Sequence, residues 1–497
     1  MNEKEIKDFL EEYNNILSMA ALEHKGNFAA LASPTLNKQE TITFLYQNVC
    51  NQIPEPTTFL KSFKKDFVLL FFLSRLIYVF VKLIHTSFRF RVKSLPMNAI
   101  YIRTWLVPRS LQNSKVHDDY FRKLIEDLEK EQTVIVGFQP LDYGKLLNKF
   151  RKVEKPENFI IPIGLLNILE IISLLFNYIT TAKIKLHKQY FYKGKDICRI
   201  INNSITKDYY NLRSFQAYLE LFIAEKIKKF KPKIFLYIFE NQAWENAYVL
   251  KFKGSNTTTI GYQSSGFSFR FLNFFPSQID SQNSLFPDKI LTVGNLYTET
   301  LKKYGHYPIS IETFAALRFD YPVENEKYKV QHPVDKIHKR ILYAFPVHYY
   351  QYAKIITDLS EVFGDSEIEV HLKYHPLYNE HAINLKLPPN FKVWSTNSKK
   401  RLNEIYDLVL SNDNSFGIES LIEGVKSYEY DFGELHHEKR LINFDCYNAT
   451  LNKKNLYLIK EQLKSNEFVK HFNHEDVSNY INKIYKPYNS SLIKLII

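Results

Sequence analysis

The chain has 497 residues and a formal net charge of +13 at pH 7. This length exceeds what one hydrophobic core usually serves, so we expect two domains of ordinary size. The positive charge suits an anionic partner, but the lysines are scattered and no zinc-finger or RNA-recognition signature accompanies them, so nucleic acid is not expected. The three cysteines lie far apart without paired spacing, which indicates neither a disulfide framework nor a zinc site.

The cysteine usage and the N-terminus favour the cytoplasm. The opening residues, MNEKEIKDFLEEYNN, are charged and lack the basic-then-apolar order of a secretory signal. Two apolar stretches, 67–84 and 159–179, resemble membrane spans but contain charges, Arg75 in the first and Glu170 in the second. A charge at the centre of a spanning helix costs about 2.5 to 3.5 kcal/mol. We therefore expect buried or interfacial helices, with peripheral attachment to the anionic inner face of the membrane as the functional alternative.

The elements expected in the first part of the chain change from helical to alternating. Residues 1–95 read mostly as helix. Strands are then expected at 99–107 and 133–138 around a helix at 118–130, a spacing typical of a parallel α/β unit. After the apolar segment 159–179, a helix at about 212–229 leads into strands at 234–239, 258–262 and 288–293. We expect residues 96–320 to form one Rossmann-like domain.

A polar, proline-bearing stretch from 309 to 338 indicates a linker. The alternation then returns, with strands at 340–345, 367–374, 391–394 and 407–410, and helices at 352–363, near 401–405 and from about 416. The second domain is expected at 335–485. The sequence thus predicts the α/β class, with two Rossmann-like domains facing a cleft and a helical N-terminal region. Open parallel sheets bind ligands at the carboxyl ends of their strands.

Polar side chains follow two strands of the first domain. In the run FENQAWEN, Glu240 and Glu245 are candidates for a general base, although both could instead complement the dipole of a helix N-terminus. The neighbouring polar groups suit a polyhydroxylated or phosphate ligand. Substrate or acceptor contacts are predicted at Asn241, Trp244, Gln263, Ser264 and Ser265.

The second domain contains two further motifs. In KYHPL, Pro376 favours extended geometry for His375, whose imidazole could contact a phosphate or leaving-group oxygen beside Lys373. A structural role is the alternative for this histidine. In SNDNSFGIESLIEG, side-chain donors precede a helix whose leading N–H groups can bind an anion, and a carboxylate follows that could hold ribose hydroxyls; an ordinary N-cap is the alternative. The donor-binding residues predicted in these two motifs are Lys373, Pro376, Ser411, Asn414, Ser415 and Glu419.

The order of these motifs resembles the two-domain glycosyltransferases of bacterial surface carbohydrate synthesis. KYHP and SNDNSFGIES are similar to motifs of the bacterial sialyltransferase, polysialyltransferase and Kdo-transferase groups, which share the GT-B fold. The resemblance covers about residues 231–431. It implies that His375 stabilises the departing nucleotide, that Ser411 and Ser415 contact the donor phosphate, and that an acidic residue of the first domain is the base.

The resemblance leaves the base open between Glu240 and Glu245, with Asp118 and Asp119 behind them. The DDY run at 118–120 lacks the glycine of the sialyltransferase-type base motif. No DxD sequence of the kind that chelates a metal with a nucleotide diphosphate is evident, so we expect catalysis without a metal and no cofactor besides the nucleotide-sugar donor.

The expected function is transfer of a sugar from a nucleotide donor to a surface polysaccharide or lipopolysaccharide acceptor. The leading donor is a CMP-activated acidic sugar such as Kdo or a sialic-acid-like sugar. Two alternatives stay open: a CDP-polyol phosphotransferase of the teichoic-acid type, and a non-catalytic carbohydrate-binding component of a polysaccharide assembly complex.

Overall fold

The computed structural model of the chain divides into two compact units, which we call the N-terminal and C-terminal units. The first comprises residues 2–320 together with 486–497, and the second residues 321–485. The structure describes residues 3–39, 65–112, 114–141, 143–267, 271–318, 339–346, 351–375, 386–394, 402–412, 414–432, 450–465 and 474–497.

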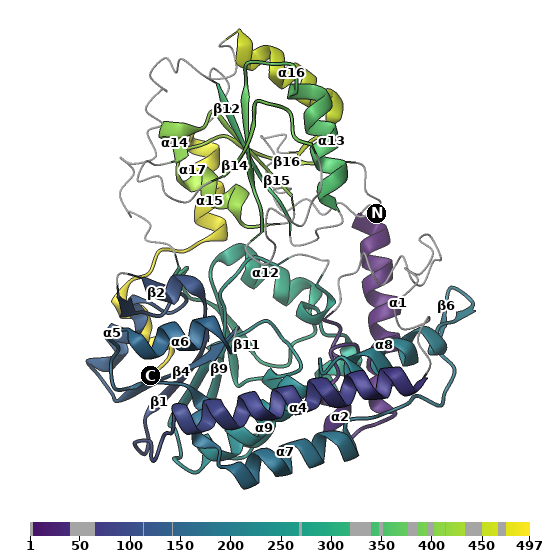
Figure 1. Ribbon diagram of the computed structural model, residues 1–497, viewed down its shortest axis with the longest axis vertical. Helices are drawn as coiled ribbons and strands as arrows, with labels where there is room; N and C mark the ends of the chain where they lie inside the picture. Colours follow the sequence, from purple (N-terminus) through teal and green to yellow (C-terminus); the bar gives the residue numbers. More distant parts are fainter. Residues whose placement is uncertain are drawn as a thin grey trace. The chain divides into compact units, whose positions relative to one another are not determined.

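A parallel sheet forms the centre of the N-terminal unit (Figure 1). Within the described residues it has seven strands in the order β11-β10-β9-β8-β1-β4-β5. Their bounds are β1 Ile100–Leu106, β4 Val134–Pro140, β5 Phe159–Ile160, β8 Ile234–Ile238, β9 Thr258–Gln263, β10 Lys289–Thr292 and β11 Ser310–Thr313. The chain builds outward from β1 on one side and from β8 on the other. Strand order therefore reverses between β1 and β8, which is the switch point where doubly wound sheets bind ligands.

The central strands are continuous apolar runs, as in IFLYI of β8, because a parallel sheet is covered on both faces. Tyr101 of β1 stacks on Phe235 of β8, which in turn stacks on Tyr248 of the following helix. Helices of this unit are α1 Glu3–Leu22, α2 Phe28–Ala32, α4 Lys65–Arg89, α5 Lys123–Glu129, α6 Lys145–Lys152, α7 Ile168–Thr181, α8 Cys198–Tyr210, α9 Phe215–Lys228, α10 Glu245–Phe252, α11 Gln278–Asn283 and α12 Asn295–Tyr304. Short 3-10 turns lie at Pro108–Ser110, Pro162–Leu165, Leu272–Phe274 and Ser490–Leu495, and small hairpins at β2 Leu111–Gln112 with β3 Lys115–Val116 and β6 Phe191–Tyr192 with β7 Lys195–Asp196.

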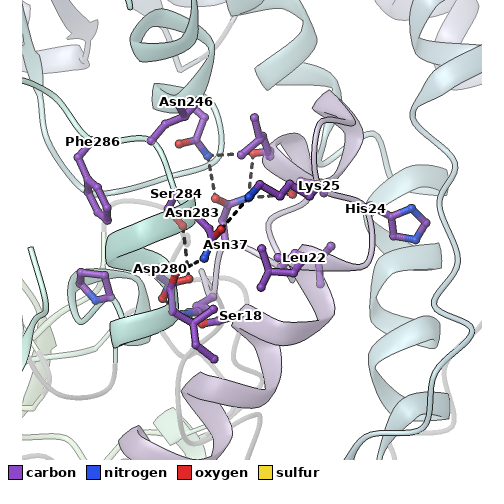
Figure 2. A pocket seen from close by; sticks show the side chains of 18 of the residues that line it. Ser18, Leu22, His24, Lys25, Asn37, Asn246, Asp280, Asn283, Ser284 and Phe286 are labelled. Atoms are coloured by element: carbon purple, nitrogen blue, oxygen red, sulfur yellow. Dashed lines mark hydrogen bonds and ion pairs between the residues drawn. The ribbon is translucent and has the colours of Figure 1, made fainter. Parts of the chain in front are cut away.

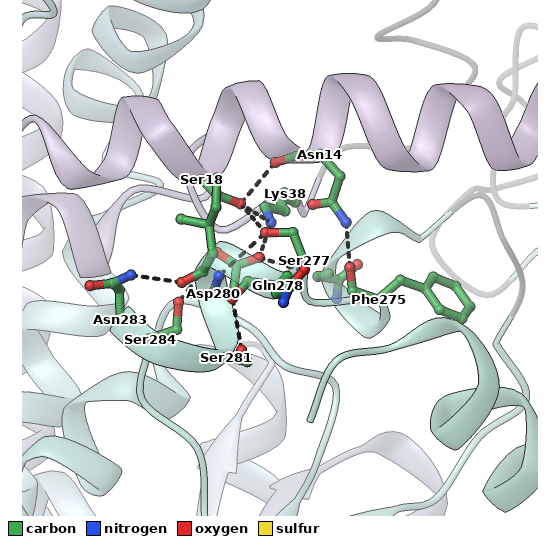
Figure 3. A network of polar contacts seen from close by, with 12 residues as sticks. Asn14, Ser18, Lys38, Phe275, Ser277, Gln278, Asp280, Ser281, Asn283 and Ser284 are labelled. Atoms are coloured by element: carbon green, nitrogen blue, oxygen red, sulfur yellow. Dashed lines mark hydrogen bonds and ion pairs between the residues drawn. The ribbon is translucent and has the colours of Figure 1, made fainter. Parts of the chain in front are cut away.

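Buried polar contacts connect α1 and the segment after α2 to residues 275–280 of the same unit (Figure 3). Lys38 forms an ion pair with Asp280 of α11 and donates a hydrogen bond to the Ser18 hydroxyl of α1. Ser18 also lies 2.8 Å from the hydroxyl of Ser277, and Asn14 donates to the Phe275 carbonyl. Residues 3–39 are therefore part of this unit.

Three sequence expectations for the N-terminal unit need correction. The expected linker at 309–338 includes β11, which pairs with β10 and precedes the buried Phe314; an edge strand this short and polar gives little sequence signal. The helix expected at 118–130 begins at Lys123, because the Asp118 carboxylate accepts the N–H groups of Tyr120 and Phe121 and forms a turn there. Residues 159–179 contain β5 and a 3-10 turn before α7.

The C-terminal unit has a second parallel sheet. In the described residues its strand order is β14-β13-β12-β15-β16-β17. The strands are β12 Arg340–Ala344, β13 Glu369–Lys373, β14 Phe391–Val393, β15 Leu408–Ser411, β16 Ser427–Tyr430 and β17 Thr450–Leu451; the helices are α13 Tyr352–Phe363, α14 Leu402–Ile405, α15 Phe416–Ile422, α16 Lys453–Lys464 and α17 His474–Ile484. Strand order reverses between β12 and β15, as in dinucleotide-binding folds. The predicted class, α/β with two parallel Rossmann-like sheets and a helical N-terminal region, is confirmed.

In the described part of the chain, α4 alone is long and apolar enough to cross a membrane by length and composition. Its segment Val68–Arg89 has a mean hydropathy of 2.0 and is only 17% buried. Helix α7 is apolar but shorter.

A buried ion pair joins the sheet of the N-terminal unit to two helices. Arg103 of β1 is fully buried and donates through Nη2 to Glu220 Oε1 of α9 at 2.7 Å. The Tyr248 hydroxyl of α10 donates to the other oxygen of Glu220. The guanidinium carbon lies 3.6 Å from the ring centroid of Trp244 and 4.0 Å from that of Trp105. The buried pair of Arg103 and Glu220 therefore connects β1, α9, α10 and the loop before α10.

We predict that Glu220→Gln lowers the free energy of unfolding by about 3 to 5 kcal/mol, because Arg103 keeps its buried charge but loses the counter-charge. Glu225→Gln on the same helix is the matched control, since its 2.9 Å pair with Lys251 is largely exposed and should matter by less than about 1 kcal/mol. Urea denaturation followed by tryptophan fluorescence measures both. Equal, small effects would contradict a structural role for the pair.

Candidate functional site

Glu240 lies at the switch point of the N-terminal sheet, directly behind β8 and Phe239. The next residue, Asn241, has a φ of 50°, a left-handed conformation that asparagine tolerates better than most side chains. Its side-chain amide donates to the Asn273 carbonyl. The chain therefore turns sharply as soon as the strand ends, and Glu240 occupies the corner.

Glu245 holds this corner together. Its Oε1 accepts the backbone N–H groups of Glu240 and Gln242, both at 2.9 Å, and its side chain is buried. Burial raises its pKa well above the ordinary value, although the two N–H donors oppose the shift. Glu245 lies in the first turn of α10, and the N–H groups that it accepts belong to the loop before the helix, so Glu245 stabilises this loop.

Glu240 is only partly buried, and one carboxylate oxygen accepts from the Gln242 side chain at 2.6 Å. Burial raises its pKa, while the nearby positive charges of Arg103 and Arg318 oppose the rise. A carboxylate with a raised pKa and access to solvent has the properties that a general base requires.

The other residues predicted to contact substrate in this unit differ in exposure. Trp244 is buried against Arg103, and its indole N–H donates to Gln242 Oε1 at 2.9 Å. Gln263 is buried and bonds to the backbone of residues 265 and 293, which fastens the ends of β9 and β10 together. Ser264 is also buried, whereas Ser265 is partly exposed. Asn241 and Ser265 are therefore the members of this group that a ligand reaches most directly.

Three arginines surround the carboxylate of Asp119, one of the less favoured candidates for the base. Asp119 is buried and lies 3.4 Å from Arg109, 3.6 Å from Arg122 and 3.6 Å from Arg318. The Arg318 guanidinium also lies over the ring of Tyr120, 5.1 Å from its centroid. This cluster joins the segment after β1 to the segment after β11. No local motif could reveal it, because Arg318 is distant from the other members in sequence.

A cavity of about 270 Å³ lies between the N-terminal helices and the segments around α10 and α11 (Figure 2). Asparagines from several elements contribute to its lining: Asn27, Asn37, Asn241, Asn246, Asn273 and Asn283. Amide groups both donate and accept hydrogen bonds, which suits a ligand with many hydroxyls. Asn241 connects this cavity to the corner that contains Glu240.

The serine-rich loop of the C-terminal unit crosses the switch point of its sheet. The Asn414 side chain donates to the carbonyls of Ala344 and Asn412, each at 2.9 Å, and accepts the N–H of Phe416 at 2.9 Å. It thereby ties the loop after β15 to the end of β12. Ser411 is buried at the end of β15. Its hydroxyl lies so close to Gly417 that any larger residue at position 417 would clash with it.

The predicted donor-binding residues gather around the same loop. The Ser415 hydroxyl donates to Glu419 Oε1 at 2.8 Å. The Lys373 ammonium at the end of β13 lies 4.6 Å from the ring centroid of Phe416, which brings the two motifs together. His375 is partly buried, and its backbone N–H donates to the Tyr352 hydroxyl at 3.4 Å. Pro376 lies outside the described residues. No group of three histidine, cysteine or acidic side chains gathers as metal ligands would in the part of the chain that is described.

No protein-family model matches the chain, and no curated protein matches it. Solved structures similar to it include the glycosyltransferase SnogD from Streptomyces nogalater, at 12% identity and a TM-score of 0.41 over 81% of this chain and 99% of that chain. UDP-GlcNAc 2-epimerase from Neisseria meningitidis, bound to UDP-GlcNAc, has 10% identity and a TM-score of 0.41 over 80% and 98%. The wall teichoic acid polymerase TagF has 11% identity and a TM-score of 0.37 over 81% and 87%. Similarities of this size assign no activity to the chain.

Burial raises the pKa of Asp118 to about 6, from an ordinary value of 3.8. The folded state therefore favours the neutral carboxyl. Its contribution to stability is fully present below the unfolded pKa and is lost as the pH rises through 6. We predict that between pH 4 and 7 wild type loses about 2 to 3 kcal/mol of unfolding free energy relative to Asp118→Asn, which resembles the neutral form. Urea denaturation at several pH values tests this, with the exposed Asp365→Asn as control; parallel pH profiles of wild type and Asp118→Asn would refute it.

Proposed function

We propose that the protein is a glycosyltransferase that moves a sugar from a nucleotide donor to a glycan or glycolipid acceptor. The observation that carries this proposal is the position of the polar clusters. Glu240 lies at the strand-order reversal of one sheet, and the Ser411 to Ser415 loop lies at the reversal of the other. Doubly wound sheets bind nucleotides and substrates at these points. Each unit has the doubly wound parallel sheet that the motif resemblance implies for an enzyme of the GT-B fold.

In this proposal the C-terminal unit binds the nucleotide. Ser415 donates to the donor phosphate, and the Glu419 carboxylate accepts from ribose hydroxyls, while the buried Ser411 supports the loop at the end of β15. Lys373 and His375 offset the negative charge that grows on the phosphate oxygen as the glycosidic bond breaks. The contact between Lys373 and Phe416 supports this arrangement, since it holds the ammonium beside the serine loop.

The N-terminal unit supplies the base. Glu240 takes the proton of the acceptor hydroxyl, whose oxygen forms a bond to the anomeric carbon while the nucleotide leaves with the electrons of the broken bond. Glu240 is favoured over Glu245 because Glu245 Oε1 already accepts two backbone N–H groups of the loop and is not open to an acceptor hydroxyl. The asparagine-lined cavity beside Asn241 is the proposed site for the acceptor glycan.

A CMP-activated acidic sugar is the proposed donor. The motif resemblance supports this choice. The three guanidinium groups around Asp119 support it as well, because arginine pairs with carboxylate and phosphate oxygens through two parallel hydrogen bonds.

We predict that purified protein releases nucleotide from a CMP-sugar in the presence of a glycan acceptor, and that Glu240→Gln lowers kcat by at least about 100-fold. Glu245→Gln keeps an oxygen that can accept the N–H groups of the loop and should retain most of the activity, and Glu131→Gln is an exposed control. A panel of CMP, UDP, GDP and CDP donors, including CDP-glycerol, is assayed for nucleotide release. Activity only with CDP-glycerol would favour polyol-phosphate transfer, and no release from any donor would contradict an enzymatic role.

We also predict that CMP raises the melting temperature of the protein, because a ligand that binds only the folded state stabilises it. Lys373→Ala should reduce CMP affinity by about tenfold through loss of a charge-assisted contact. His375→Ala should abolish turnover and leave the protein folded. The exposed Lys454→Ala serves as the charge-matched control. An unchanged melting temperature with CMP, CDP and UDP would argue for a non-catalytic binding component.

A further inference from the structure

Helices α4 and α7 expose large apolar side chains to an unusual degree. On α4 the exposed fractions are 64% for Leu70, 63% for Ile77 and 58% for Val81. On α7 they are 76% for Leu169 and 68% for Phe176. Single exposed apolar residues are ordinary on protein surfaces, but a contiguous group of this kind marks an interaction surface.

The exposed residues follow helical spacing on both helices. On α4, Leu70, Leu73, Ile77, Val81 and Phe88 recur at intervals of three, four or seven residues, and all are exposed. The opposite side of α4 is also apolar and is buried in the unit. A helix that is apolar on both sides needs a second non-aqueous neighbour.

The two stripes belong to one surface. Helix α4 contacts α7, and Figure 1 shows both helices on the same part of the N-terminal unit. On α7 the exposed positions Leu169, Ile172, Phe176 and Ile179 continue the apolar group. We call these two stripes together the α4–α7 surface.

Basic side chains border the C-terminal end of α4. Arg89 at this end donates a hydrogen bond to Asn148 of α6, so that α6 lies beside it. The exposed basic residues of this border are Arg91, Lys93, Lys145, Lys149, Arg151 and Lys152, with the exposed acids Glu154 and Glu157 following α6. The excess of positive charge next to an apolar surface complements a membrane with anionic headgroups.

Two features of α4 favour a position in the membrane interface over a span. Phe72, Leu76 and Leu83 are buried against the unit, so protein covers one side of the helix over this stretch. Arg75 and Lys82 lie in its middle, with the Lys82 ammonium 4.4 Å from the ring centroid of Tyr78. Long cationic side chains that fold back onto apolar groups are typical of helices at the headgroup level.

We propose that the α4–α7 surface docks the protein onto an anionic lipid bilayer, with the apolar stripes at the boundary between headgroups and acyl chains and the basic border on anionic headgroups. This inference is independent of the proposed enzymatic function. It identifies the surface that would carry the peripheral membrane attachment expected from the sequence.

Flotation of the full chain with phosphatidylcholine vesicles, with and without phosphatidylserine, tests the proposal. We expect binding to the anionic vesicles that weakens at high salt. Ile77→Gln combined with Phe176→Gln should reduce this binding at least tenfold, and Lys149→Gln about fivefold. Leu458→Gln, a similarly exposed apolar residue of the C-terminal unit, is the matched control and should bind as wild type does.

The proposal would be overturned if the protein floated with no vesicle, or if Leu458→Gln lost as much binding as the double variant. It would also be overturned if the protein were a dimer in sedimentation velocity that Ile77→Gln with Phe176→Gln dissociates, and vesicles bound neither dimer nor monomer. If alkaline extraction failed to release the protein from native membranes, a membrane-spanning α4 would replace the interfacial position. Circular dichroism of each variant checks folding, which these exposed positions should preserve.

Discussion

The buried pair of Arg103 and Glu220 is the constraint on which the N-terminal site depends. A guanidinium removed from water is tolerated only when it is paired, and here the pairing involves β1, α9 and, through the Tyr248 hydroxyl, α10. Trp105 near the end of β1 and Trp244 before α10 cover the guanidinium. Trp105 belongs to β1 and Trp244 to the loop that follows β8, and these two strands are neighbours at the switch point. The corner that presents Glu240 is therefore positioned by the core of the unit.

Within that corner, two carboxylates five residues apart have different roles. Glu245 gives Oε1 to the loop's own N–H groups, whereas Glu240 makes one side-chain contact and stays partly open to solvent. Burial raises the pKa of both. The direction of the pKa shift does not distinguish the two carboxylates, whereas their hydrogen-bond partners do. Glu245 stabilises the shape of the loop, and Glu240 is the carboxylate that we propose as the base.

Much of the architecture was predictable, because buried parallel strands are apolar runs and the polar residues behind them mark the binding edge. Glu240 and the Ser411 loop were predicted in this way, and both lie where the strand order of their sheet reverses. The sequence could not reveal the partner of Arg103, since Glu220 is 117 residues away and a lone arginine in a strand suggests exposure. Arg318, which completes the cluster at Asp119, was assigned to a linker because β11 is short and polar. These features depend on contacts between distant segments.

The asparagine-lined cavity and the α4–α7 surface, considered together, suit the glycolipid acceptor that we propose. The asparagine-lined cavity includes Lys25, Gly26 and Asn27, and a second hollow on the other side of the same turn reaches Asn177 and Thr181 of α7. Helix α7 also contributes an apolar stripe to the α4–α7 surface. If the α4–α7 surface binds lipid as we propose, an acceptor could keep its lipid in the bilayer beside α7 while its glycan enters these two neighbouring pockets, which share Lys25, Gly26 and Asn27. A soluble acceptor would need the cavity and would leave the apolar stripes without a purpose.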